Sequence, residues 1–104
     1  MKDFIDLEGA SGALYRFRLW REGAAHLPMA GNYVFVRPED ESVKVLAVGE
    51  CNDLSQVLSR WSNGTRRGAT HAFTRLNVSR GVRMAEFEDL AANHKAARLS
   101  ENAG

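Results

Sequence analysis

The most informative segment of the chain is GNYVFVRPEDESVKVLAVGECNDL, from Gly31 to Leu54. It contains two apolar runs, NYVFVR and VKVLAVG, which are rich in the β-branched and aromatic residues that favour strands. The residues PEDES separate these runs, and their proline and acidic side chains favour a turn. The segment therefore predicts a β-hairpin from Asn32 to Val48.

The hydrophobic period changes after Gly49. Apolar residues then recur at i, i+3, i+4 and i+7, which is the spacing of one helix face: Leu54, Val57, Leu58 and Trp61. Either Asp53 or Asn52 supplies an N-cap, and Asn63-Gly64 supplies a stop. The sequence thus predicts a hairpin that leads directly into a short capped helix.

Three further elements follow from the same kind of pattern. From Ala13 to Trp20 the residue types alternate with the two-residue period of a half-buried strand. One side of this strand carries Tyr15, Phe17 and Leu19, and the other carries Leu14, Arg16, Arg18 and Trp20. In the segment HAFTRLN the residue types again alternate with the two-residue period of a strand, which predicts another strand from His71. From Ser79 onward, apolar residues at helical spacing predict a long helix to about Leu99.

A chain of 104 residues has room for one domain with one modest core. We expect an α+β fold, an α/β sandwich in which a small antiparallel sheet is flanked by two or three helices. The sheet consists of the hairpin, a third strand and an added N-terminal strand. We divide the chain into an N-terminal strand extension over residues 1–26, a core over 27–99 and a flexible tail over 100–104.

Several classes of protein are excluded at this point. The N-terminus carries three carboxylates in its first eight residues and lacks the apolar stretch of a signal peptide. No segment approaches the roughly 20 apolar residues of a membrane span, so we expect a soluble, cytoplasmic protein without a membrane partner. Cys51 is the only cysteine, and the three histidines are widely spaced, so no dedicated metal site is expected. Cys51 would be a reactive thiol only if a helix N-terminus lowered its pKa.

The charge is unevenly distributed, although the net charge is only +1. No carboxylate occurs between Leu54 and Ala85, yet six arginines do: Arg60, Arg66, Arg67, Arg75, Arg80 and Arg83. The planar guanidinium offers paired donors to phosphate oxygens, and His71 lies on the same strand face as Arg75. This region is therefore either a nucleic-acid-binding surface or a solvated face paired with the more acidic N-terminal half.

The stretch from about Leu27 to Leu99 resembles the GIY-YIG endonuclease domain. Gly31-Asn32-Tyr33 matches the first motif of that family, and Ala47-Val48-Gly49 matches the second. The resemblance implies a three-stranded antiparallel sheet flanked by helices, with a catalytic tyrosine at Tyr33 and a metal-binding glutamate at Glu86 or Glu88.

Departures from the family pattern argue against catalysis. Ala47 replaces the second-motif tyrosine, Glu50 replaces a frequent lysine, and Val57 stands where the family has its helix arginine. Losing one electrostatic donor of this kind typically costs about a hundred- to a thousandfold in rate. Tyr33 and Glu86 are therefore expected to be vestigial catalytic residues, and Mg²⁺ would be a cofactor only of a residual nuclease.

We accordingly expect a catalytically degenerate GIY-YIG-like domain that binds DNA or RNA. The candidate binding residues are Arg60, Arg66, Arg67, His71, Arg75, Arg80 and Arg83. One alternative is a protein-interaction module that forms homo-oligomers through the strand from Ala13 to Trp20. A second alternative is a weak metal-dependent nuclease.

Overall fold

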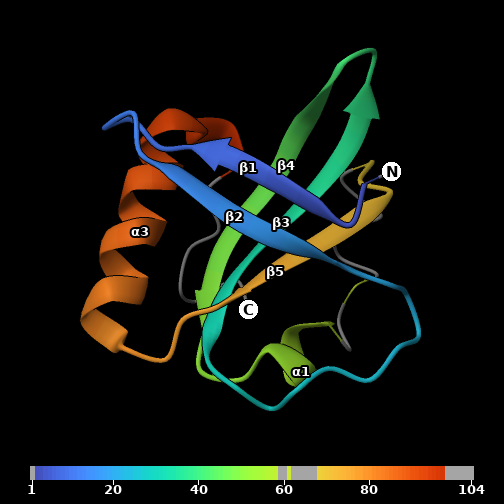
Figure 1. Ribbon diagram of the computed structural model, residues 1–104, viewed down its shortest axis with the longest axis vertical. Helices are drawn as coiled ribbons and strands as arrows, with labels where there is room; N and C mark the ends of the chain where they lie inside the picture. The colour runs from blue at the N-terminus through green and yellow to red at the C-terminus, as the bar shows by residue number, and fades with distance from the viewer. Residues whose placement is uncertain (1, 59–60, 62–67, 98–104) are drawn as a thin grey trace.

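The structure, a computed structural model, describes residues 2–58, 61 and 68–97 of the chain. Its elements are β1 (Phe4–Glu8), β2 (Leu14–Trp20), β3 (Gly31–Glu39), β4 (Ser42–Cys51), α1 (Leu54–Leu58), β5 (His71–Leu76), α3 (Arg80–Asn93) and a 3₁₀ turn, Lys95–Ala97 (Figure 1). The expected α+β class is confirmed.

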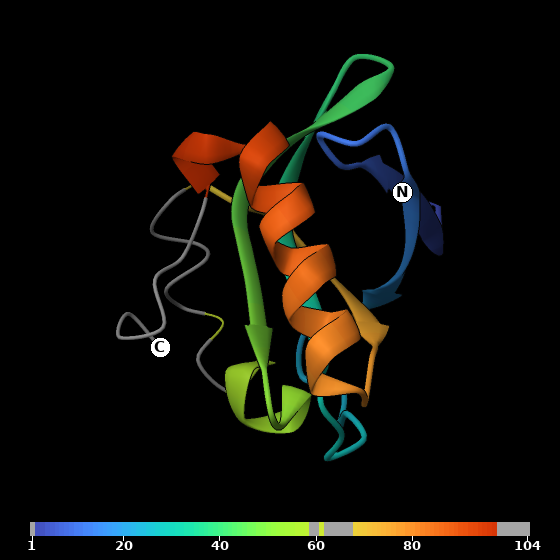
Figure 2. The same ribbon diagram turned by 90° about the vertical axis from the view of Figure 1, so that its left-hand side faces the viewer.

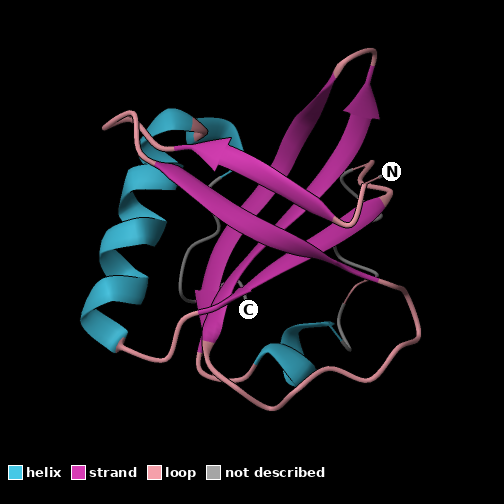
Figure 3. Cartoon of the chain, in the orientation of Figure 1, coloured by secondary structure: helices cyan, strands magenta, loops and turns pink. Residues whose placement is uncertain are grey.

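All five strands form one antiparallel sheet in the order β1-β2-β5-β3-β4. The sheet is curled, so that β1 and β2 cross over β3 and β4 (Figure 3). The prediction of a single N-terminal strand was wrong, because β1 precedes β2 and pairs with it from Glu8 opposite Leu14 to Phe4 opposite Arg18. β2 is consequently paired on both sides, by β1 and β5, and is not a free edge.

The strand β3 is buried on both faces over residues 31–36, where it separates two apolar clusters. Val34 and Val36 point to one face, where they pack with residues of α3 that include Phe87. Tyr33 and Phe35 point to the opposite face, where the second cluster contains residues of α1. Figure 2 shows α3 lying along its face of the sheet, with α1 at one end of the molecule.

The hairpin is longer than predicted, since β3 and β4 pair from Gly31 opposite Cys51 to Glu39 opposite Ser42. Asp40 turns the chain with a positive φ of 41°. Such a conformation is uncommon outside glycine, although aspartate tolerates it better than most residues. The predicted acidic turn is thus confirmed in a tighter form.

Both helices begin where the sequence indicates. Asp53 caps α1, because its Oδ1 accepts hydrogen bonds from the backbone N–H and the hydroxyl of Ser55, at 3.0 and 2.6 Å. The predicted stop at Asn63-Gly64 lies outside the described residues. The helix α3 ends at Asn93 rather than near Leu99, because His94 leaves helical geometry at φ −128° and ψ 58°.

His94 ends α3 with its side chain partly buried. Its Nε2 atom finds no hydrogen-bond partner among the described residues. Burial lowers the pKa of this imidazole, and a hydrogen bond to the Glu8 backbone opposes that shift. The folded state therefore resists protonation of His94 more than the unfolded state does.

We expect this imidazole to make folding less favourable in acid. As the pH falls below the ordinary histidine pKa of about 6.5, the unfolded chain gains the proton first, so stability declines. Urea unfolding at pH 7.5 and pH 5 measures this loss, which His94→Gln should reduce. An unchanged pH dependence in the variant would contradict the assignment.

None of the helices in the described part of the chain is long and apolar enough to cross a membrane. The tail over residues 100–104 lies outside the described part.

Candidate functional site

The two candidate catalytic residues lie on opposite faces of the sheet. Tyr33 packs in the cluster beside α1. Its neighbour Asn32 points the other way, toward α3, where it accepts a hydrogen bond from Asn77, which also bonds to Glu86. Successive side chains of a strand alternate between faces, so β3 itself separates Tyr33 from Glu86.

Apolar packing surrounds Ala47 and Val57, the two positions where the resemblance would place further catalytic residues. Ala47 is fully buried in the same cluster as Tyr33, and Val57 packs against that cluster. Gly49 lies directly opposite Tyr33 across the hairpin, and a Cβ atom at Gly49 would collide with the tyrosine ring. This face is therefore a packed core around Tyr33, which is only 6% exposed.

On the other face, Arg83 of α3 lies inside the protein with a 4% exposed side chain. Its Nε donates to a carboxylate oxygen of Glu50 at 2.8 Å. Its two terminal nitrogens donate to the carbonyls of Asn77 and Val78 and to the side chain of Asn52, at 3.1 to 3.2 Å. Every nitrogen of the guanidinium is thus engaged, which removes Arg83 from any binding surface.

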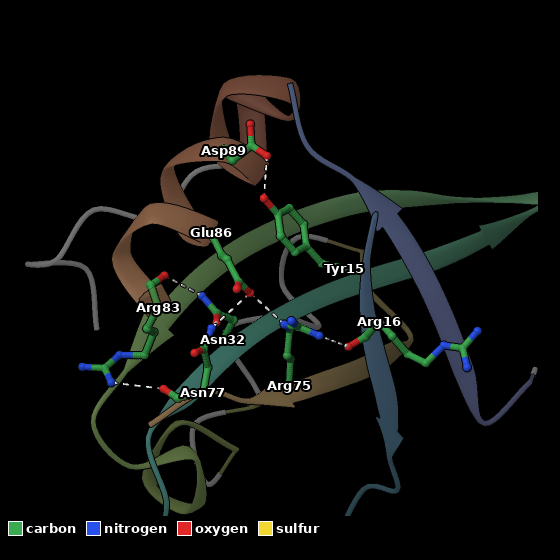
Figure 4. Close-up of polar contacts among 8 residues, drawn as sticks. All are labelled: Tyr15, Arg16, Asn32, Arg75, Asn77, Arg83, Glu86 and Asp89. Atoms are coloured by element: carbon green, nitrogen blue, oxygen red, sulfur yellow. Dashed lines mark hydrogen bonds and ion pairs between the residues drawn. The ribbon is translucent and has the colours of Figure 1, made fainter. Parts of the chain in front are cut away.

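Glu86 is likewise held by neighbouring side chains (Figure 4). Its Oε1 accepts hydrogen bonds from Nε of Arg75 at 2.8 Å and from Asn77 at 3.1 Å. Arg75 also donates from Nη1 to the carbonyl oxygen of Arg16 at 3.2 Å. We call Asn32, Glu50, Asn77, Arg83 and Glu86 the polar cluster; through Arg75 it connects α3 to β5 and β2.

The seven predicted nucleic-acid contacts do not form one surface in the described structure. Arg60, Arg66 and Arg67 lie outside the described residues. Arg83 is buried, and Arg80 is exposed in the first turn of α3. Only His71 and Arg75, which are both partly exposed, line neighbouring hollows beside β2.

A different set of cations borders a groove on the outside of β2. This arginine groove has a volume of about 580 Å³ and lies between β2, β5 and the loop that follows β2. Its arginines are Arg16, Arg18, Arg21 and Arg75, of which Arg75 is already paired with Glu86. His26 also lines the groove, and the apolar lining includes the exposed side chains of Phe4, Leu27 and Leu76. No carboxylate is among its lining residues.

The sheet register sets the position of the groove. Arg18 lies opposite Thr74, and Thr74 lies opposite Tyr33, so all three share one face. His26 connects the loop after β2 to Thr74 of β5. Its Nδ1 donates to the Leu27 carbonyl at 2.9 Å, and its Nε2 lies 3.0 Å from the Thr74 hydroxyl. The loop is thereby fixed as one wall of the groove.

The arginines of the groove differ in their pairing. Arg16 makes a two-point contact with Asp6 at 2.9 and 3.2 Å, which lowers the pKa of the Asp6 carboxyl. Arg21 approaches Asp3 at 3.4 Å, with both side chains more than two-thirds exposed. Arg18 is exposed and forms no hydrogen bond or ion pair with any described residue. Arg18 and Arg21 are therefore the cations most available to a ligand.

Sequence reasoning did not single out this set, although the signal was present. The alternation of β2 already places Arg16, Arg18 and Trp20 together on the face away from Phe17. The alternation along β2 does not predict the other wall of the groove. That wall consists of the loop through His26 and the strand β5, whose positions depend on the tertiary fold.

Cys51 ends β4 beside the start of α1. Burial is the main cause that raises the pKa of its thiol to about 11, from an ordinary 9.0. The predicted condition for reactivity, a lowered pKa, is therefore absent at Cys51.

We expect iodoacetamide to label Cys51 roughly a hundredfold more slowly at pH 8 in the folded protein than in the urea-unfolded chain. The physical reason is that the alkylating reagent reacts with the thiolate, whose share falls as the pKa rises. Mass spectrometry of timed samples measures both rates. Equal rates in the two states would contradict the burial of this thiol.

Comparison of the chain with protein-family models, curated proteins and solved structures finds no match in any of the three. Within the described residues, no group of three or more His, Cys, Asp or Glu side chains is arranged to hold a metal ion.

Proposed function

We propose that the chain is a GIY-YIG-like domain that binds nucleic acid through the arginine groove and does not cleave it. The observation that carries the proposal is the groove itself, which has arginines on its walls and no lining carboxylate. Such a surface matches the regularly spaced charges of a phosphate backbone.

The family relationship is supported by the order of elements. The hairpin β3-β4, the short helix α1, the strand β5 and the long helix α3 follow one another as the resemblance implies. β5 pairs with β3, so the three strands form a sheet of their own within the larger one. β1 and β2 are the addition, and β2 carries two of the arginines of the groove, Arg16 and Arg18.

The absence of cleavage is supported by the separation of the candidate catalytic groups. Tyr33 and Glu86 lie on opposite faces, so they cannot act on one phosphate from their present positions. Glu86 already accepts hydrogen bonds from Arg75 and Asn77. Apolar side chains fill the region around Ala47 and Val57.

The test is the salt dependence of binding to a labelled oligonucleotide of about 12 nucleotides. Affinity should fall steeply between about 50 and 200 mM salt, because bound counterions leave the phosphates. Arg18→Ala should reduce the slope of log affinity against log salt by about 1, the value of one lost phosphate contact. Lys44→Ala, which alters an exposed side chain of β4, is the matched control and should leave the slope unchanged.

Two results would contradict the proposal. The first is undetectable affinity at about 50 mM salt, where electrostatic binding should be strongest. The second is cleavage of the oligonucleotide in the presence of Mg²⁺ that disappears in Tyr33→Phe, which would favour the weak nuclease instead.

A further inference from the structure

The arginine groove continues past Trp20 into a second hollow. This tryptophan pocket has a volume of about 280 Å³ and shares Leu19, Trp20 and Arg21 with the arginine groove. Its other walls include Trp61, Thr70 and His71. A volume near the lower end of the roughly 300 to 1,000 Å³ typical of ligand pockets suits one planar ring system rather than a large ligand.

Trp20 is held in a fixed position between the two hollows. Its indole N–H donates to the carbonyl of Ala24 at 2.9 Å. Trp61 stands edge-on to it at 6.3 Å between ring centroids and is itself fixed edge-on to Phe35 at 4.8 Å. Trp20 remains partly exposed, whereas Trp61 is 6% exposed. A ring that is already ordered loses little conformational freedom when a ligand stacks on it.

The rim of the tryptophan pocket carries polar groups. His71 uses Nδ1 for a 2.8 Å contact with the Thr70 hydroxyl, and its Nε2 has no hydrogen-bond partner among the described residues. Glu22 and Arg21 complete the polar lining. A fixed aromatic ring with hydrogen-bonding groups at its edge matches a nucleobase, which offers a flat face for stacking and polar atoms around it.

We infer that the ligand of the arginine groove is single-stranded nucleic acid, with its phosphates on the arginines and one base in the tryptophan pocket. This inference rests on the proposed function and narrows it. The bases of a duplex are paired and stacked inside the helix, so a duplex presents phosphates to the groove but no base to the pocket. A single strand presents both, and base stacking on aromatic side chains tolerates any sequence.

The first experiment compares three unlabelled competitors of equal length against a labelled single strand bound to the full chain. One competitor is a single strand with bases, the second is an abasic single strand with the same phosphates, and the third is a duplex. We expect the strand with bases to compete roughly tenfold better than the abasic strand. It should also compete better than the duplex at equal nucleotide concentration.

The outcomes separate this inference from the proposed function. Equal competition by the abasic and base-containing strands would overturn the base pocket and leave phosphate binding by the groove intact. Stronger competition by the duplex would also overturn the inference. Failure of the labelled strand to bind at all would overturn the proposed function and the inference together.

Variants of Trp20 test the position of the base. Trp20→Leu should weaken binding of the base-containing strand roughly tenfold and leave the weaker binding of the abasic strand unchanged. Trp20→Phe, which loses the same hydrogen bond to Ala24 but keeps an aromatic face, should retain most of the affinity. Equal losses in the two variants would overturn the stacking role. The competitor experiment on the unaltered chain keeps the inference testable if Trp20→Leu does not fold.

Discussion

Replacing Arg83 by methionine is expected to lower the free energy of unfolding by about 3 to 5 kcal/mol, the usual cost of removing one partner of a buried ion pair. The guanidinium of Arg83 engages Glu50, Asn52 and the carbonyls of Asn77 and Val78. Without it, the Glu50 carboxylate, whose side chain is 19% exposed, has lost its counter-charge, and two carbonyls have lost their donor. Since small domains are stable by only about 5 to 15 kcal/mol, this loss is a large fraction of the free energy of unfolding.

Equilibrium unfolding in urea measures this loss. Arg80→Met is the matched control, because it makes the same change at an exposed position of the same helix and should stay within about 0.5 kcal/mol of the parent. Adding Glu50→Gln to Arg83→Met should recover part of the loss, since the uncompensated charge is then removed. A loss below about 1 kcal/mol in Arg83→Met would mean that the polar cluster does not support the fold.

The second large effect is expected in the affinity for nucleic acid when charges of the arginine groove are reversed. Reversing two charges of the groove, with Arg18→Glu and Arg21→Glu together, should weaken nucleic-acid affinity about a hundredfold or more at low salt. Two attractive contacts become repulsive in this variant. Both side chains are exposed, so the fold should be unaffected, and fluorescence anisotropy of a labelled single strand measures the change.

The control variant carries Lys44→Glu and Arg80→Glu. It has the same net charge as the groove variant and alters exposed residues that do not line the groove. Its affinity for the single strand should fall only slightly, because the net charge of the protein has become more negative. If only the control variant lost affinity, the interface would lie away from β2, and the assignment of the groove would be contradicted.

Local patterns in the sequence predicted most of the elements but not their full number. β1 was missed, although Ile5 and Leu7 alternate with Asp6 and Glu8 in the burial pattern of a half-exposed strand. The charges of this N-terminal segment exclude a signal peptide but are compatible with the exposed side of a strand. The existence of β1 depends on pairing with β2, and that pairing places Arg16 and Arg18 within the sheet rather than at its edge.

The role of Arg83 could not be predicted from helical spacing. Its position matches the buried face of α3, which also carries Phe87, Leu90 and Ala91. A lone arginine on such a face has no explanation until a partner is known, and Glu50 comes from another element, 33 residues away in the sequence. In the sequence, Glu50 stands out only as a departure from the second motif, where the GIY-YIG family often has lysine.

The motif residues themselves have packing roles in this chain. A Cβ atom on Gly31 would collide with the backbone carbonyl of Arg75 and with Leu54, and one on Gly49 would collide with the ring of Tyr33. These glycines allow close contact between strands and between the sheet and α1. The two glycines of the motifs therefore have a packing role in this fold.

The most direct test of the proposed nucleic-acid interface is a ¹H–¹⁵N NMR titration of the full chain with a single-stranded oligonucleotide at low salt. We predict that shifts concentrate on the backbone amides of Arg16–Arg21 and Ala24–Leu27 and on the indole N–H of Trp20. The amides at the far end of the hairpin, Ser42–Val45, should stay unchanged. Shifts confined to that hairpin end or to α3, or no shifts at all, would contradict the assignment of the arginine groove.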